Sequence, residues 1–537
     1  MTLDVGFDDP FDNPADAEHS WRRAQSSPLT RLYQDVLNSY YEAARRCYEH
    51  TGAPMAREHI ALWIDGWPYV RGPEADERAA ERLAAHGRHI QAYADRGDSY
   101  YVSELRPEVV GLIERLRKHP RISASVETLV PHVEECIDAY AHIMGDLHWR
   151  FAGAIAAAGR TPFFWPTLYH EITGRPEAEA PTMLGGLANE MAKTIRVMQR
   201  LARIVREDDD LRKAVESKDA GALERDEPSF RRFRTGFRVF LRNHGVRCGH
   251  GYGSKSTLET PTWRMRPEIP LGMIATYARS DIDAAGRKEK DAARERRRLT
   301  NAVRRELRSD PERLARFDAA LEQAKVYATR IEDHNHWMDQ SAPGVLREAV
   351  DLLGRRLVRD GVIDDPDDVM HLSRAELRDL ARGELGGDLR TVIAERRRHR
   401  DESAARKAPH HIGVAPTDQA MERFAPVGAG LEGRVLHGIP ASSGRYVGRA
   451  RIVPQRLEPP DLDDGDILVA IDAGPSWTPV FAVLGALVLD RGAAFQHAAV
   501  MAREFGIPGV VGTKEATKTI VDGQTITVDG DAGVVEL

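Results

Sequence analysis

The stretch ALVLDRGAAFQHAAVMAREFGIPGVVG, residues 486–512, carries the strongest information about the fold. Its first five residues form an apolar run that ends at Asp490 and has the character of a buried strand. A turn of small residues follows, and His497 then opens a helix that continues through Ala498, Val500 and Arg503. A β-branched run, GVVG, closes the stretch. The order strand, helix, strand predicts a mixed α/β unit.

The same alternation of short strands and turns extends over the last 110 or so residues. Short β-branched runs (GRARIV, DILVA, TITV and GVVEL) alternate with glycine and Asp-Gly turns. Before residue 410 the apolar residues instead recur every three or four positions, as in residues 29–50 and 311–340, which is typical of amphipathic helices. We therefore predict an α+β multidomain protein in which a large, mainly α-helical domain precedes a small β/α domain.

The predicted boundaries are 1–407 for the helical region, 408–430 for a linker and 431–537 for the β/α domain. The linker is rich in proline, glycine and alanine and lacks periodicity. A flexible segment of this length spans about 25 Å, which suits a domain that swings between two sites. An ordered connector without motion is the alternative.

Composition excludes several classes of protein. The chain has 537 residues and a formal net charge of −7, which argues against a general nucleic-acid binder. Two arginine-dense stretches, residues 286–307 and 394–407, are interpreted as solvated helix faces. The three cysteines, Cys47, Cys136 and Cys248, are widely spaced, so neither disulfides nor a thiolate metal site is expected. The acidic N-terminus and the lack of a long apolar run predict a soluble, cytoplasmic protein without a membrane partner.

His497 is the residue that we expect to carry the chemistry. The N-terminus of a helix favours an anion, so a phosphoryl group on this imidazole would be held there. Histidine is also a competent nucleophile near neutral pH. The small residues around it, such as Gly492 and Ala498, predict a ring exposed to incoming substrates. Without further information, a histidine that follows a strand is more often structural.

The residues around His497 resemble the mobile phosphohistidine domain of the phosphoenolpyruvate-utilising enzymes. In that family a glycine-rich turn, a histidine, two small residues, an apolar pair and Ala-Arg-Glu-x-Gly-Ile-Pro follow one another. This chain has Gly492 and then HAAVMAREFGIP, residues 497–508. The resemblance implies a swivelling domain with His497 as the phosphoryl carrier. The family often places Thr or Ser near the histidine, whereas this chain has Phe495-Gln496, so hydroxyl support from those positions is missing.

The helical region is similar to the acceptor-binding region of phenylphosphate synthase and rifampicin phosphotransferase. The segments that carry this similarity are residues 145–153, 165–176, 243–270, 332–340 and 364–377. They bring aromatic and charged side chains into a region of helix formers, which suits a pocket for a small aromatic alcohol or phenol. Arg247 and Arg264 are candidates for neutralising a phosphoryl group, and Trp337 is a candidate for binding the substrate, although tryptophan more often belongs to the core.

Several residues near position 335 are candidates for the base that accepts the proton of the acceptor hydroxyl. They are Asp333, His334, His336 and Asp339. Glu332 and His336 lie one helical turn apart and could both contact a metal ion, but two ligands do not make a site. No metal is predicted for this chain.

The source of the phosphoryl group is expected to be a separate subunit. The helical region lacks the alternating strands and helices of an ATP-grasp domain, and the segment GYGSKST lacks the spacing of a Walker loop. The histidine-bearing subunits of phenylphosphate synthase and of the 4-cresol-phosphorylating enzyme, which this chain resembles, work with an ATP-grasp partner. The resemblance implies dikinase-type transfer from ATP with Mg²⁺, bound mainly by that partner. The alternatives are another acceptor, such as a natural product or pyruvate, and a non-catalytic carrier or scaffold.

Overall fold

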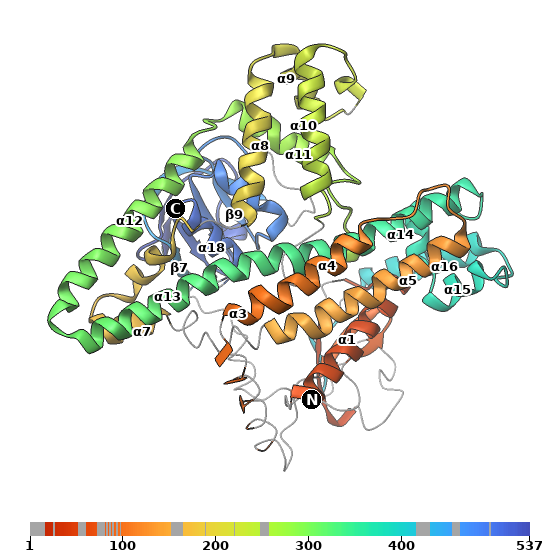
Figure 1. The fold of residues 1–537 in the computed structure, drawn as a ribbon, viewed down its shortest axis with the longest axis horizontal. Helices are drawn as coiled ribbons and strands as arrows, with labels where there is room; N and C mark the ends of the chain where they lie inside the picture. Colours follow the sequence, from red (N-terminus) through yellow and green to blue (C-terminus); the bar gives the residue numbers. More distant parts are fainter. Residues whose placement is uncertain are drawn as a thin grey trace. The chain divides into compact units, whose positions relative to one another are not determined.

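The computed structural model describes the chain with gaps. The described residues are 17–24, 27–51, 61–71, 81, 84, 87–88, 91–92, 95–96, 98–151, 165–187, 190–219, 221–247, 257–406, 408–414, 430–453, 462–492 and 496–537. They confirm the predicted architecture, because a large helical region precedes a small C-terminal β domain (Figure 1).

The chain divides into two compact units, each built from three stretches of sequence. Unit 1 consists of Met1–Ala157, Tyr252–Pro261 and Trp337–Ala425, and unit 2 consists of Ala158–Gly251, Thr262–His336 and Pro426–Leu537. These units do not coincide with the predicted boundaries at 407 and 431, which therefore stay a prediction. Unit 2 unites part of the helical region with the β domain.

Unit 1 is mainly helical. Its helical elements are α1 (Arg31–Thr51), α3 (Asp98–Tyr100), η2 (Tyr101–Leu105), α4 (Arg106–Leu116), α5 (Val126–His142), η3 (Ile143–Leu147), η6 (Thr257–Glu259), α14 (Ala342–Arg359), η9 (Pro366–His371), α15 (Arg374–Ala381) and α16 (Leu389–Ala405). Helix α5 packs against both α1 and α14. The apolar stripe that predicted a helix over residues 29–50 faces this packing, since Leu32, Val36 and Ala44 are buried.

Unit 1 also contains a four-stranded sheet that the sequence analysis missed. The strands are β1 (Ser20–Arg23), β2 (Ala61–Ile64), β3 (Trp67–Arg71) and β4 (His411–Gly413), in the order β2-β3-β1-β4. Asp65 and Gly66 turn from β2 into β3 with φ values of 49° and 79°, the geometry that favours Asp-Gly in tight hairpins. Strand β4 lies within the segment predicted as a linker, and residues 415–429 of that segment lie outside the described residues.

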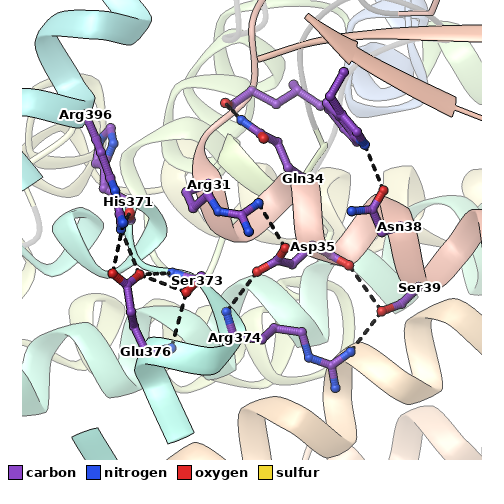
Figure 2. Close-up of polar contacts among 12 residues, drawn as sticks. Arg31, Gln34, Asp35, Asn38, Ser39, His371, Ser373, Arg374, Glu376 and Arg396 are labelled. Carbon is purple, nitrogen blue, oxygen red and sulfur yellow. Dashed lines mark hydrogen bonds and ion pairs between the residues drawn. The ribbon is translucent and has the colours of Figure 1, made fainter. Parts of the chain in front are cut away.

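Polar contacts tie α1 to the start of α15 within unit 1 (Figure 2). The backbone N–H of Arg374 donates to Asp35 over 2.9 Å. Burial alone would raise the pKa of the Glu376 carboxyl, but hydrogen bonds from Arg396 and Ser373 lower it to about 2. Polar residues of the segment 364–377 thus cap helices and form ion pairs.

Unit 2 contains two groups of helices. The first is α8 (Glu190–Arg206), α9 (Asp209–Glu216), η5 (Gly221–Leu223), α10 (Pro228–His244) and α11 (Glu268–Arg279), with α8 lying against both α10 and α11. The second is α7 (Trp165–Thr173), η4 (Glu177–Leu184), α12 (Ala284–Glu306), η7 (Leu307–Ser309) and α13 (Pro311–His334). The π-helical turn η8 (Asn335–Ser341) follows α13. Among the described helices of the chain, none is both long and apolar enough to cross a membrane.

The β domain of unit 2 is one nine-stranded sheet. Its strands are β5 (Gly430–Glu432), β6 (Val435–His437), β7 (Ile439–Ser442), β8 (Arg445–Val453), β9 (Ile467–Ala470), β10 (Ala486–Leu489), β11 (Gly509–Val511), β12 (Thr525–Asp529) and β13 (Val534–Glu536). The order is β5-β6-β13-β12-β8-β9-β10-β11-β7, with β8 to β11 parallel and the other pairs antiparallel. Every β-branched run singled out in the sequence forms one of these strands.

Alternation along the central strands places the sheet between two cores. Leu468 and Leu487 belong to the core shared with α8, α10, α11, α18 (His497–Glu504) and η10 (Pro475–Ala482), whereas Val469 and Val488 belong to the core on the opposite face. That opposite core also includes Ala516 of α19 (Ala516–Thr519). The helix that begins at His497 therefore packs between the sheet and the helices of unit 2.

Candidate functional site

His497 is the first residue of α18, as the sequence predicted. The helix follows β10 and a turn, and Gln496 is its N-cap. The predicted exposure of the ring was wrong, because only 4% of the side chain is accessible. The small residues that suggested an open ring instead let α18 pack closely, and the shared core with the helices of unit 2 covers it.

Both ring nitrogens of His497 have partners within unit 2. Nδ1 lies 3.1 Å from Oε1 and 3.0 Å from Oε2 of Glu332, at the end of α13, and Nε2 lies 2.9 Å from the hydroxyl of Thr478, in η10. A carboxylate can only accept, so the proton of a neutral ring is placed on Nδ1. The Thr478 hydroxyl then donates to Nε2, whose lone pair is the nucleophilic position of the ring.

Glu332 begins a run of five buried polar residues at the junction of α13 and η8. Glu332, Asp333, His334, Asn335 and His336 are between 0% and 6% exposed. Such a run is unusual in a helix whose preceding turns show an amphipathic pattern, because buried polar groups must be hydrogen-bonded. Asn335 donates to Oε1 of Glu332 over 3.4 Å. A π-helical turn at such a place is common at functional sites.

The buried guanidinium of Arg247 contacts the same run. Its Nη2 donates to the hydroxyl of Thr194 over 2.5 Å and lies 3.2 Å from Nδ1 of His336. Its Cζ lies 5.4 Å from the ring centroid of Trp263. Since arginine only donates, Nδ1 of His336 is an acceptor and its proton lies on Nε2. Arg247 and His336, both predicted as site residues, are therefore brought together, with His336 holding the guanidinium.

The far end of α18 adds buried charge to this region. Burial, together with the carboxylates of Glu332 and Glu289, raises the pKa of Glu504 well above its usual value. Burial lowers the pKa of Arg503 to about 10, against the opposing effect of Glu504 and Glu332. Burial thus raises the pKa of Glu504, and Glu332 is the carboxylate that faces His497.

The other predicted residues are placed less centrally. Arg264 is half-buried in unit 2 and donates to the carbonyl of Arg242 over 3.5 Å. Trp337 and Asp339 belong to unit 1, where Asp339 lies 3.6 Å from Nε2 of His148 and the Trp337 ring lies beneath the guanidinium of Arg106. The segment GYGSKST lies almost wholly outside the described residues. Glu332 and His336, which helical spacing offered as a pair of metal ligands, contact different side chains.

Sequence reasoning missed the roles of Glu332 and Thr478 as partners of His497. Thr478 supplies the hydroxyl that the family pattern led us to expect beside the histidine, but from η10 rather than from the turn before α18. The available signal for Glu332 was the run EDHNH at the end of a long amphipathic helix, which interrupts the apolar period. No comparable pattern marks Thr478.

Two domain families match parts of this chain. Residues 462–533 match the mobile domain of PEP-utilising enzymes, and residues 150–330 match the fourth domain of rifampicin phosphotransferase. A rifampicin phosphotransferase of Streptomyces sp is 29% identical over 463 residues, which are 82% of this chain and 51% of that protein. The uncharacterised phosphotransferase YvkC of Bacillus subtilis (strain 168) is 28% identical over 379 residues, 68% of this chain and 44% of that protein.

A third relative is a much longer protein. Chondramide synthase of Chondromyces crocatus is 30% identical over 384 residues, which are 66% of this chain but only 10% of that protein. This chain therefore spans about half the length, or less, of these curated relatives. The buried histidine on α18 lies inside the segment that matches the mobile domain of PEP-utilising enzymes. The chain is related to the rifampicin phosphotransferases.

Proposed function

We propose that this chain is the histidine-bearing component of a dikinase-type phosphotransferase. In this proposal His497 accepts a phosphoryl group and passes it to a hydroxyl of a small aromatic acceptor of the phenol or 4-cresol type. The observation that carries the proposal is the environment of His497, whose Nδ1 faces Glu332 and whose Nε2 faces the Thr478 hydroxyl. Such an arrangement places the proton on Nδ1 and leaves Nε2 as the nitrogen that carries the phosphoryl group.

The phosphoryl donor in this proposal is ATP, held with Mg²⁺ by an ATP-grasp partner. Nε2 attacks the β-phosphorus, its lone pair forms the P–N bond, and the bond from that phosphorus to the α-β bridging oxygen breaks, with AMP as the leaving group. The γ-phosphoryl group goes to water as phosphate. The resemblance to dikinases and to split phenylphosphate synthases supports this step.

Discharge is proposed to take place against the helices of unit 2. The acceptor oxygen forms a bond to phosphorus as the P–Nε2 bond breaks, and the electron pair returns to Nε2. Arg247 supports this step as a buried cation that stabilises the equatorial oxygens. His336 is the weaker candidate for the base, because a second proton on it would face that guanidinium. We therefore assign the hydroxyl proton to His334.

A larger acceptor is the second candidate. The match of residues 150–330 to the fourth domain of rifampicin phosphotransferase favours a rifampicin-like hydroxyl compound, since this region includes Arg247 and most of α13. Phenol, 4-cresol and rifampicin differ enough in size that one discharge assay separates the two candidates.

The experiment incubates the chain with ATP labelled at the β-phosphorus, with and without a candidate ATP-grasp partner. We expect acid-labile, base-stable label on the wild type that is absent from His497→Ala. Addition of each acceptor in turn then shows which one removes the label. Label on His497→Ala would overturn the carrier role. Label that no hydroxyl compound removes would leave the carrier or scaffold alternative.

A further inference from the structure

Glu332 is a buried carboxylate that lies against the ring of His497. Its side chain is 0% exposed, and both of its oxygens lie within 3.1 Å of Nδ1 of His497. Oε2 accepts no hydrogen bond among the described residues. A buried carboxylate without a donor is strongly destabilising, so the imidazole N–H has a structural reason to point at Glu332.

Glu332 and Thr478 contact the same ring from different parts of unit 2. Thr478 lies in η10, between β9 and β10 of the sheet that also carries α18. Glu332 lies on α13, in the helical part of the unit. If the β domain leaves the helices to be charged, Thr478 travels with His497 and Glu332 stays behind. The two contacts therefore act at different stages of the relay.

We propose that Glu332 is a positioning residue for the discharge step, which holds the proton on Nδ1 of His497 so that the phosphoryl group leaves from Nε2. This inference rests on the proposed function and identifies the residue that controls the histidine in the docked state. During discharge the P–Nε2 bond breaks, its electron pair returns to Nε2, and the phosphorus–oxygen bond to the acceptor forms. The Nδ1 proton stays in place throughout, so the leaving group is a neutral imidazole rather than an imidazolate.

The charges around Glu332 agree with this role. Glu504, Arg503 and Tyr327 interact electrostatically with Glu332, and burial raises the pKa of Glu504. Asn335 donates to Oε1 of Glu332, which fixes the position of the carboxylate. Glu332 can then stabilise the positive ring of the phosphorylated histidine, in the way that a buried aspartate stabilises an imidazolium.

The first test measures directly which nitrogen of the His497 ring carries the proton, and it needs no phosphoryl donor. Nitrogen-15 NMR of histidine-labelled protein, with the His497 signals assigned through His497→Ala, should show the proton on Nδ1 in the wild type. Glu332→Ala should lose this preference, and Glu332→Asp should keep part of it. Glu322→Ala is the matched control, since Glu322 is an exposed residue of the same helix. A proton on Nε2 in the wild type, or identical spectra for wild type and Glu332→Ala, would overturn the inference.

The second test separates charging from discharge. Glu332→Ala should acquire label from the partner at the wild-type rate but lose it to the acceptor about 100-fold more slowly. Equal discharge rates would contradict the role of Glu332. Absence of label on the wild type would instead contradict the proposed function, while the NMR result would still report on Glu332.

Discussion

The hydroxyl of Thr478 lies 2.9 Å from Nε2 of His497, although 19 positions separate the two residues in the sequence. Thr478→Val keeps the shape of the side chain and removes this contact. We expect slower labelling of His497 as well as slower discharge, since Thr478 belongs to the same sheet domain as the histidine. Initial rates of labelling measure the effect, and Thr478→Ser should restore them. A valine variant with wild-type rates would show that the contact has no role in the relay.

Arg247 and Arg264 were predicted together as phosphoryl-binding cations, and their environments now separate them. Arg247 is buried and contacts His336, whereas Arg264 is half-buried and donates to a backbone carbonyl. Arg247→Gln should slow discharge about 100-fold, the usual effect of removing one transition-state donor. Arg264→Gln should leave the rate within a few-fold of wild type.

Loss of a buried cation can also destabilise the fold, so the Arg247 variants need a control for stability. Thermal unfolding of Arg247→Gln and Arg247→Lys reports on this, and the lysine variant, which keeps the charge, should recover part of the discharge rate. If Arg264→Gln were the slower of the two glutamine variants, the assignment of the phosphoryl-binding cation would have to be reversed.

The sequence predicted the parts of this chain that repeat a strong local pattern. The β-branched runs became the central strands of the C-terminal sheet, and the apolar period over 311–340 became α13, because burial of one face dominates both patterns. The hairpin of β2 and β3 was missed although Asp65-Gly66 marks it, since its strands are short and stand inside a helical region.

The candidate site was predictable only where one residue carries a local signature. His497 has such a signature in the residues that follow it. Glu332, which contacts His497, lies 165 positions away in the sequence. A contact of this range depends on how α13 packs against the sheet domain, and nothing in the local sequence around either residue encodes it. The predicted exposure of the ring failed for the same reason, since small neighbours permit close packing as readily as access.

His371 is expected to make unit 1 sensitive to mild acid. Burial and the nearby guanidinium groups of Arg397 and Arg400 lower the pKa of His371 to about 4, from 6.5, with Asp368 opposing them. Between these two values the unfolded chain binds a proton that the folded chain does not, so the free energy of unfolding falls as the pH decreases from about 6.5 to about 4. The slope from this residue approaches about 1.4 kcal/mol per pH unit in the middle of that range.

His371→Gln removes the titrating group and should reduce this pH dependence. Denaturant midpoints at pH 7 and pH 5 measure it, and the difference between the two midpoints should be smaller in the variant than in the wild type. The buried backbone around His371 is held by Arg396, which donates to its carbonyl over 2.8 Å, and this contact does not need the imidazole. Equal differences for both proteins would show that other groups determine the acid sensitivity.

In the proposed relay His497 leaves its buried position before it is charged, and a reversible lock tests this step. The hydroxyls of Thr182 in η4 and Ser443 after β7 lie 3.2 Å apart, so we place the two cysteines of the lock at these positions. Oxidised Thr182→Cys/Ser443→Cys should show labelling as low as that of His497→Ala, because the partner cannot reach the ring. Reduction should restore labelling, while each single variant should behave as wild type under both conditions. Full labelling of the oxidised double variant would mean that His497 is charged without leaving the helices of unit 2, and Glu332 would then act in charging as well as in discharge.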